Sequence, residues 1–119
     1  VVAANGTSMA NASAQFTYLT PMNIFPPTRV RGFQVKNQFA AQTDIVNILT
    51  WQPPSQGEKP VAYRIYRDPT LTKLIAKVSS SKRLRFEDHQ RKKGKAYNYY
   101  IVSIDQFSNR SEAVQIRVK

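Results

Sequence analysis

The residues that could perform acid–base or metal chemistry are few, and their spacing does not favour it. His89 is the only histidine and there is no cysteine, so a zinc site of the usual kind is not expected. Glu87 and Asp88 are adjacent in an expected strand and should point to opposite faces instead of pairing as acid and base. The Ser79-Ser80-Ser81 run has no partner base nearby, and no glycine-rich phosphate loop is present. The sequence therefore predicts a protein that is not an enzyme and that binds no metal or cofactor.

Positive charge is the most pronounced chemical property of the chain. Its 119 residues include 18 Lys and Arg against 7 Asp and Glu, a formal net charge of +11. Such an excess favours contact with anionic surfaces: nucleic acid, phospholipid headgroups or acidic polysaccharide. The densest stretch is 82–95, and its candidate polyanion-binding residues are Lys82, Arg83, Arg85, Arg91, Lys92, Lys93 and Lys95.

The alternative for this basic stretch is a solubilising role, because lysines on the rim of a sheet block strand-to-strand aggregation. No aromatic stacking residue interleaves with the charges as a binder of single-stranded nucleic acid would need. That absence favours the solubilising alternative.

Alternation along three expected strands predicts a second candidate surface. With Tyr63 and Tyr99 pointing inward, a set of tyrosine, arginine and aliphatic side chains points outward together. This candidate protein-binding face comprises Arg64, Tyr66, Tyr100, Val102, Ile104 and Arg117. Its composition is that of interface centres. The alternative is ordinary surface decoration, since outer faces often carry aromatic or β-branched residues for cross-strand pairing.

A framework of short strands must position these side chains. One strand ends at Trp51, where Pro53-Pro54 breaks the ladder, and the next has Val61, Tyr63 and Ile65 on its inner face. Further strands are expected over residues 30–35, 71–78 (with Leu74, Ala76 and Val78 alternating), 82–87, 96–105 and 112–118, with 36–42 as a connection. Seven short strands with turns at about 8–12-residue spacing predict an all-β sandwich. The expected core is Trp51, Tyr63, Ile65, Tyr97, Tyr99 and Ile101.

The N-terminal residues differ from the rest. Residues 1–20 carry no charged side chain, and Asn5-Gly6 is a strong hairpin signal; the alternatives are a β-hairpin and a flexible arm. Three prolines between residues 20 and 27 predict an extended spacer. We expect residues 1–25 to be the end of a preceding sandwich repeat, or an extended arm with its linker, and residues 26–119 to be one domain. Neither a signal peptide nor an apolar run of the ~20 residues that cross a bilayer is expected.

Residues 27–118 resemble a fibronectin type III domain. The matching segments are Leu49-Thr50-Trp51 with Pro53-Pro54, Ala62 to Arg67, Phe86-Glu87-Asp88, Gly94, Tyr97-x-Tyr99-x-Ile101, and Asp105 to Ser111. The resemblance implies a seven-stranded immunoglobulin-like sandwich with a tyrosine corner at Tyr97, whose hydroxyl bonds back to upstream backbone. The sequence departs at Arg91-Lys92-Lys93, where the family usually packs a leucine. Residues 1–20, with V-V-A-A-N-G-T-S and F-T-Y-L, resemble the closing strands of a TIG-type immunoglobulin-like domain.

These observations together predict a non-catalytic β-sandwich module of a larger, exported or cell-surface protein, bacterial by its resemblance. Such a repeat module would act in protein–protein interaction, adhesion or domain spacing, with another protein or neighbouring domains of the same chain as partner. Two alternatives remain. One is a polyanion-binding domain that uses the stretch 82–95, and the other is an accessory module of a secreted carbohydrate-active hydrolase.

Overall fold

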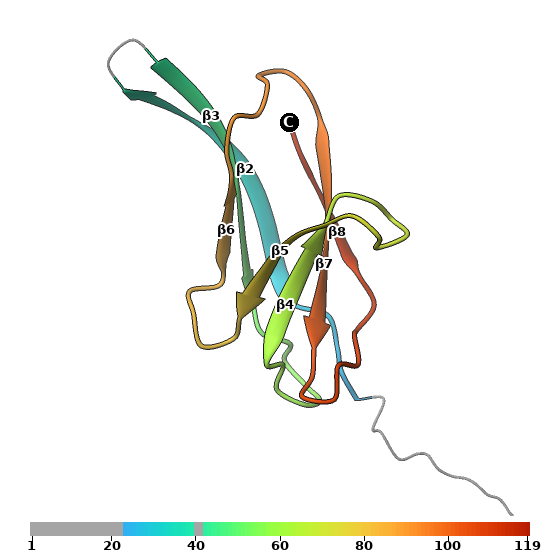
Figure 1. Ribbon diagram of the computed structural model, residues 1–119. Helices are drawn as coiled ribbons and strands as arrows, with labels where there is room; N and C mark the ends of the chain where they lie inside the picture. Colours follow the sequence, from blue (N-terminus) through green and yellow to red (C-terminus); the bar gives the residue numbers. More distant parts are fainter. Residues whose placement is uncertain (1–22, 40–41) are drawn as a thin grey trace, which may run out of the picture.

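The computed structural model describes residues 23–39 and 42–119, which form seven strands in two antiparallel sheets (Figure 1). The three-stranded sheet has the order β2–β3–β6, from β2 (Thr28–Phe39), β3 (Gln42–Gln52) and β6 (Arg85–Asp88). The four-stranded sheet has the order β5–β4–β7–β8, from β5 (Leu74–Ser79), β4 (Ala62–Tyr66), β7 (Tyr97–Ile104) and β8 (Val114–Val118). The predicted all-β sandwich is confirmed. The hairpin expected within residues 1–20 lies outside the described residues.

The principal core fills the space between the two sheets. Trp51 at the end of β3 meets Tyr63 of β4 edge to face, with ring centroids 5.7 Å apart and an interplanar angle of 64°, a favourable geometry for two aromatic rings. The buried members of this core are Leu49, Trp51, Tyr63, Ile65, Tyr99, Ile101 and Val118. Tyr97 is partly buried and packs against it.

The sheets approach closely at Gly32 in β2. A Cβ placed there would lie 2.5 Å from Cγ2 of Val118 and 3.1 Å from side-chain atoms of Ile116 and Leu49. No side chain fits at this position without displacing a core residue. The glycine therefore allows β2 to pack directly against β8.

The first hairpin is longer than the sequence analysis expected. Residues 36–42 were predicted to be a connection, and that prediction is wrong: the antiparallel pairing of β2 with β3 continues from Val35↔Val46 to Phe39↔Gln42. Strand β6 pairs with β3 only over Asn47–Thr50, so the hairpin beyond that point is a two-stranded ribbon that projects past the sandwich (Figure 1). A ribbon with no third strand needs no apolar alternation, and its polar residues therefore resemble a loop in sequence.

Strand β5 also departs from its expected pattern. The register with β4 shifts between Ile65↔Ala76 and Tyr66↔Leu74, which leaves one extra residue in β5. A bulge of this kind reverses which side chains face inward. Ala76 and Val78 pack against the core as predicted, whereas Leu74 is exposed. Val61, also expected inside, is exposed just before β4 begins.

The segment before β2 packs on the sandwich. Ile24 is buried, and the backbone N–H of Glu58 donates to the carbonyl of Asn23 at 3.0 Å. Gly57 has φ +80° and touches this segment so closely that a Cβ would fall on the Phe25 ring. Residues 23–25, expected to belong to the spacer, are thus fixed against the β3–β4 connection.

Candidate functional site

A buried polar network lies near the end of the sandwich where β6 finishes. The Tyr99 hydroxyl donates to Oδ2 of Asp88 at 2.6 Å and accepts from Nδ2 of Asn47 at 2.9 Å. Gln34 extends the chain by donating to Oδ1 of Asn47 at 2.8 Å. Burial raises the pKa of the Tyr99 phenol, and its hydrogen bond to Asp88 raises it further. The phenol therefore stays protonated and acts as a fixed donor.

Two arginines compensate the charge of Asp88 in this network. The Arg67 guanidinium donates to Oδ1 at 3.0 Å and lies over the Tyr99 ring at 6.0 Å. Nε of Arg91 lies 3.7 Å from the same oxygen. The network therefore connects both sheets with the loops after β4 and β6. The polar atoms of the network form hydrogen bonds with one another, so its role is to stabilise the fold. This network was not predicted from the sequence.

Ionisable side chains also form a row on the outer face of the three-stranded sheet. Nδ1 of His89 lies 2.6 Å from Oδ2 of Asp44, and Nε2 lies 3.2 Å from Oε1 of Glu87. Glu87 in turn accepts from Arg85 at 2.8 Å. The hydrogen bond to Asp44 raises the pKa of His89 above its usual value of 6.5, and Glu87 adds to the effect. The row joins the projecting hairpin, which carries Asp44, to the end of β6.

This geometry predicts a pH-dependent contact. Because the folded-state pKa of His89 is raised, the contact is at full strength below pH 6.5 and weakens as the pH rises through the folded-state value. We expect an NMR titration of the imidazole to give a pKa above 6.5, despite the Arg85 and Arg91 charges nearby. Asp44→Asn should lower it more than Glu87→Gln, because the Asp44 contact is shorter. A wild-type pKa at or below the usual histidine value would contradict this account.

The basic stretch is divided by β6 into two groups. Lys82, Arg83 and Arg85 lie at the start of β6, whereas Arg91 and the three lysines that follow lie in the loop beyond its other end (Figure 1). The single polyanion-binding stretch expected over residues 82–95 is thus split into two groups, because the extended strand β6 separates them.

The candidate protein-binding face lies on one side of the four-stranded sheet, as its alternation predicts. Tyr66 pairs with Tyr100, and Arg64 pairs with Val102. The structure nevertheless buries three of the six side chains: Tyr66, Val102 and Ile104 form a second apolar cluster with Ala62, against which Leu71 and Tyr100 pack. Arg64 and Tyr100 are half-buried and Arg117 is exposed. The accessible part of the face is therefore smaller than six residues.

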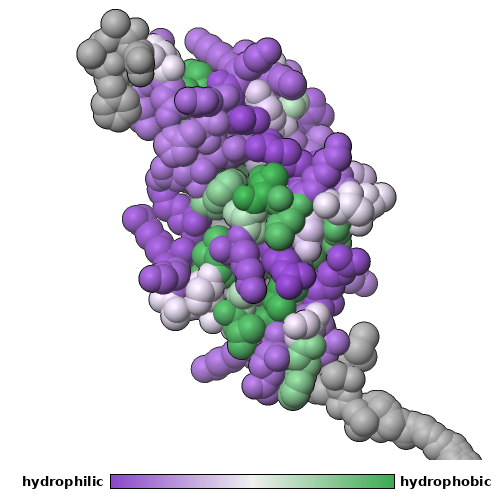
Figure 2. All heavy atoms as spheres, in the orientation of Figure 1, coloured by the Kyte–Doolittle hydropathy of each residue, from purple (hydrophilic) through white to green (hydrophobic). Residues whose placement is uncertain are grey.

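Figure 2 shows the surface that this arrangement produces. Hydrophobic side chains lie in the middle of the view, over β4, β5 and β7, with hydrophilic side chains both among and around them. Apolar side chains within a polar rim are the usual anatomy of a protein interface.

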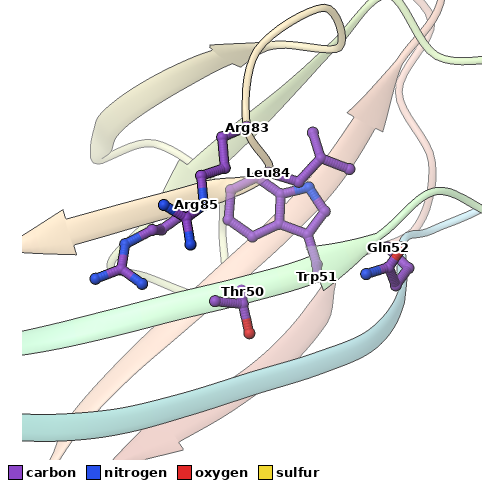
Figure 3. A pocket seen from close by; sticks show the side chains of 6 residues that line it. All are labelled: Thr50, Trp51, Gln52, Arg83, Leu84 and Arg85. Atoms are coloured by element: carbon purple, nitrogen blue, oxygen red, sulfur yellow. The ribbon is translucent and has the colours of Figure 1, made fainter.

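A pocket of about 280 Å³ lies beside Trp51 at the start of β6 (Figure 3). The residues that line it are Thr50, Trp51, Gln52, Arg83, Leu84 and Arg85. Nε1 of Trp51 is buried and has no hydrogen-bond partner among the described residues. The lining offers hydrogen-bond donors and positive charge but no carboxylate, histidine or cysteine, so the pocket could bind a ligand but offers no acid–base pair.

Other kinds of site are not found in the part of the chain that the structure describes. Residues 23–39 and 42–119 contain no group of three His, Cys, Asp or Glu side chains that could hold a metal ion. Within the same ranges there is no helix with the length and apolar character needed to cross a membrane. No model of a known protein family matches the chain, and no match was found among curated proteins.

Proposed function

We propose that the chain is a fibronectin type III-like module that acts without catalysis, by binding a protein partner or a neighbouring domain, in a larger exported or cell-surface protein. Strand arrangement supports the fold assignment: β5 pairs with β4 in the four-stranded sheet, whereas a constant-type immunoglobulin domain places its fourth strand in the other sheet. The tyrosine corner supports it as well, because the Tyr97 hydroxyl accepts from the backbone N–H of Lys92 at 2.8 Å.

The observation that carries the binding function is the apolar cluster on the outer face of the four-stranded sheet. A solvated sheet face normally carries polar side chains, yet here Tyr66, Val102 and Ile104 are buried on that face and the half-buried Tyr100 packs against them. Arg64 lies within the cluster, where it pairs with Val102, and the exposed Arg117 lies on β8. Tyrosine and arginine side chains around apolar contacts are the composition of a binding hot spot.

Site-specific photocrosslinking in the full-length parent protein tests this proposal. A photoreactive phenylalanine analogue at position 100 should form crosslinks to a defined partner protein or to a neighbouring domain. The matched control is the same analogue at position 107, where Phe107 is 60% exposed in the β7–β8 loop, away from the face. Crosslinks that are absent from position 100, or equal at both positions, would overturn the assignment of this face.

A further inference from the structure

The positive charge of the molecule is largely uncompensated. Only three of the 18 basic side chains, Arg67, Arg85 and Arg91, form an ion pair with a carboxylate, and all 18 lie within residues 23–39 and 42–119. Three of the other five carboxylates are occupied locally. Asp44 contacts His89 and accepts from the backbone N–H of Gln90, Asp68 accepts from the backbone of Thr72 and Lys73, and Asp105 accepts from its own loop. Little negative charge is left to screen the lysines.

The loop between β6 and β7 concentrates this charge on a fixed framework. Its backbone is held by the N–H of Arg91, which donates to the carbonyl of Ile45 at 2.8 Å, and by the N–H of Lys92, which donates to the Tyr97 hydroxyl at 2.8 Å. The N–H of Lys95 donates to the carbonyl of Lys92 at 3.4 Å. A loop ordered before binding loses less conformational entropy when a ligand arrives.

The Tyr97 ring also positions the charged groups. The Arg91 guanidinium lies 5.4 Å and the Lys95 ammonium 5.5 Å from its centroid, both within cation–π range. Lys92 and Lys93 are exposed beside them. Because Val118 pairs with Tyr97, the exposed Lys119 follows at the same end of the sheet.

Protection of a sheet edge does not account for this cluster. The free edge of the three-stranded sheet on this side is β6 itself, Arg85–Asp88. The lysines lie beyond its end, in a loop, where there is no open ladder to protect. The solubilising role therefore fits Arg85 better than Lys92, Lys93 and Lys95.

We propose that the β6–β7 loop, with Lys92, Lys93 and Lys95 as its charged contacts, is a binding site for an acidic polysaccharide that carries sulfate or carboxylate groups. This site is separate from the proposed protein-binding face. Arg91 and Lys95 already contact the Tyr97 ring, so the ring is not free to stack on a nucleic-acid base. The exposed large hydrophobic side chains of the described residues, Phe33, Val61, Leu74 and Phe107, lie outside the loop, and an apolar anchor for a membrane surface is thus missing there.

The test compares two variants that lose the same charge from opposite ends of the molecule. The first is Lys92→Gln/Lys93→Gln/Lys95→Gln. The matched control is Arg29→Gln/Lys59→Gln/Arg110→Gln, three exposed residues at the start of β2, in the β3–β4 connection and in the β7–β8 connection, at the end of the molecule opposite the β6–β7 loop (Figure 1). Binding of a heparin-derived octasaccharide is measured by calorimetry over a series of salt concentrations, with melting temperature as the check that both variants fold.

We expect the loop variant to bind the octasaccharide about tenfold or more weakly and to flatten the slope of log affinity against log salt by about three units, while the control changes little. Equal weakening in both variants would mean that net charge, not this loop, binds the polysaccharide, and would overturn the proposal. Absence of binding by the wild-type protein would do the same. So would tighter binding to a short DNA duplex or to phosphatidylserine vesicles than to the octasaccharide.

Discussion

Trp51→Ala should remove a large part of the domain's free energy of unfolding and lower its melting temperature by far more than a few degrees. The indole is 2% exposed, packs edge to face on Tyr63 and lies in the principal core between the sheets. Truncating a buried aromatic side chain to alanine costs about 3–5 kcal/mol, against a total of ~5–15 kcal/mol for a domain. The indole also lines the pocket beside Leu84, so its loss would open that pocket into the core.

Urea denaturation and thermal melting measure this effect, and Phe107→Ala is the matched control. Phe107 is an aromatic side chain of comparable size but 60% exposed in a loop, so its removal should change stability by less than about 0.5 kcal/mol. A Trp51→Ala protein that melts within a few degrees of the wild type would contradict the central role of the indole.

Asp88→Ala should lower the free energy of unfolding by about 2–3 kcal/mol. The substitution removes the acceptor for the Tyr99 hydroxyl and for the Arg67 guanidinium, which are 2.6 Å and 3.0 Å from the carboxylate. Breaking a fully buried pair costs about 3–5 kcal/mol. The expected cost is smaller here because the Arg67 side chain is 32% exposed and regains water.

Glu87→Ala is the control for Asp88→Ala. Glu87 is the adjacent carboxylate on β6 and also pairs with an arginine, Arg85, but its side chain is 40% exposed. An exposed pair of this kind contributes little to stability, because water screens the two charges. Chemical denaturation of the two variants should therefore give clearly different losses, and equal losses would show that the network around Asp88 is not desolvated.

Most of the fold could be predicted from hydrophobic period and turn residues. Trp51, the two prolines just after it and the alternating strand that follows placed both Trp51 and Tyr63 in the core, and both lie there in the structure. The pattern fails where two strands pair without a third. Residues 36–39 pair with residues 42–45 in such a ribbon, and nothing in the composition of the segment 36–42 separates a ribbon from a loop.

The site was less predictable, for two physical reasons. Alternation assigns a side chain to a face but does not say how much of that face its neighbours cover, so Val102 and Ile104 were expected at the surface. The second reason is that a buried polar residue can be recognised only once its hydrogen-bond partners are known. Those partners come from distant parts of the chain. One local signal existed: Asn47 shares the inward phase of Leu49 and Trp51, and a polar residue in that phase indicates a buried hydrogen bond.

The fixed segment before β2 has a mechanical consequence. Asn23 enters at one end of the sandwich, held by Glu58 and packed beside Gly57, and the C-terminus lies at the opposite end (Figure 1). A force that pulls these two ends apart acts along the strands. It therefore loads all the hydrogen bonds between two paired strands in shear at the same time, instead of breaking them one after another. The packed Ile24 carries that load into the body of the domain before β2 is reached.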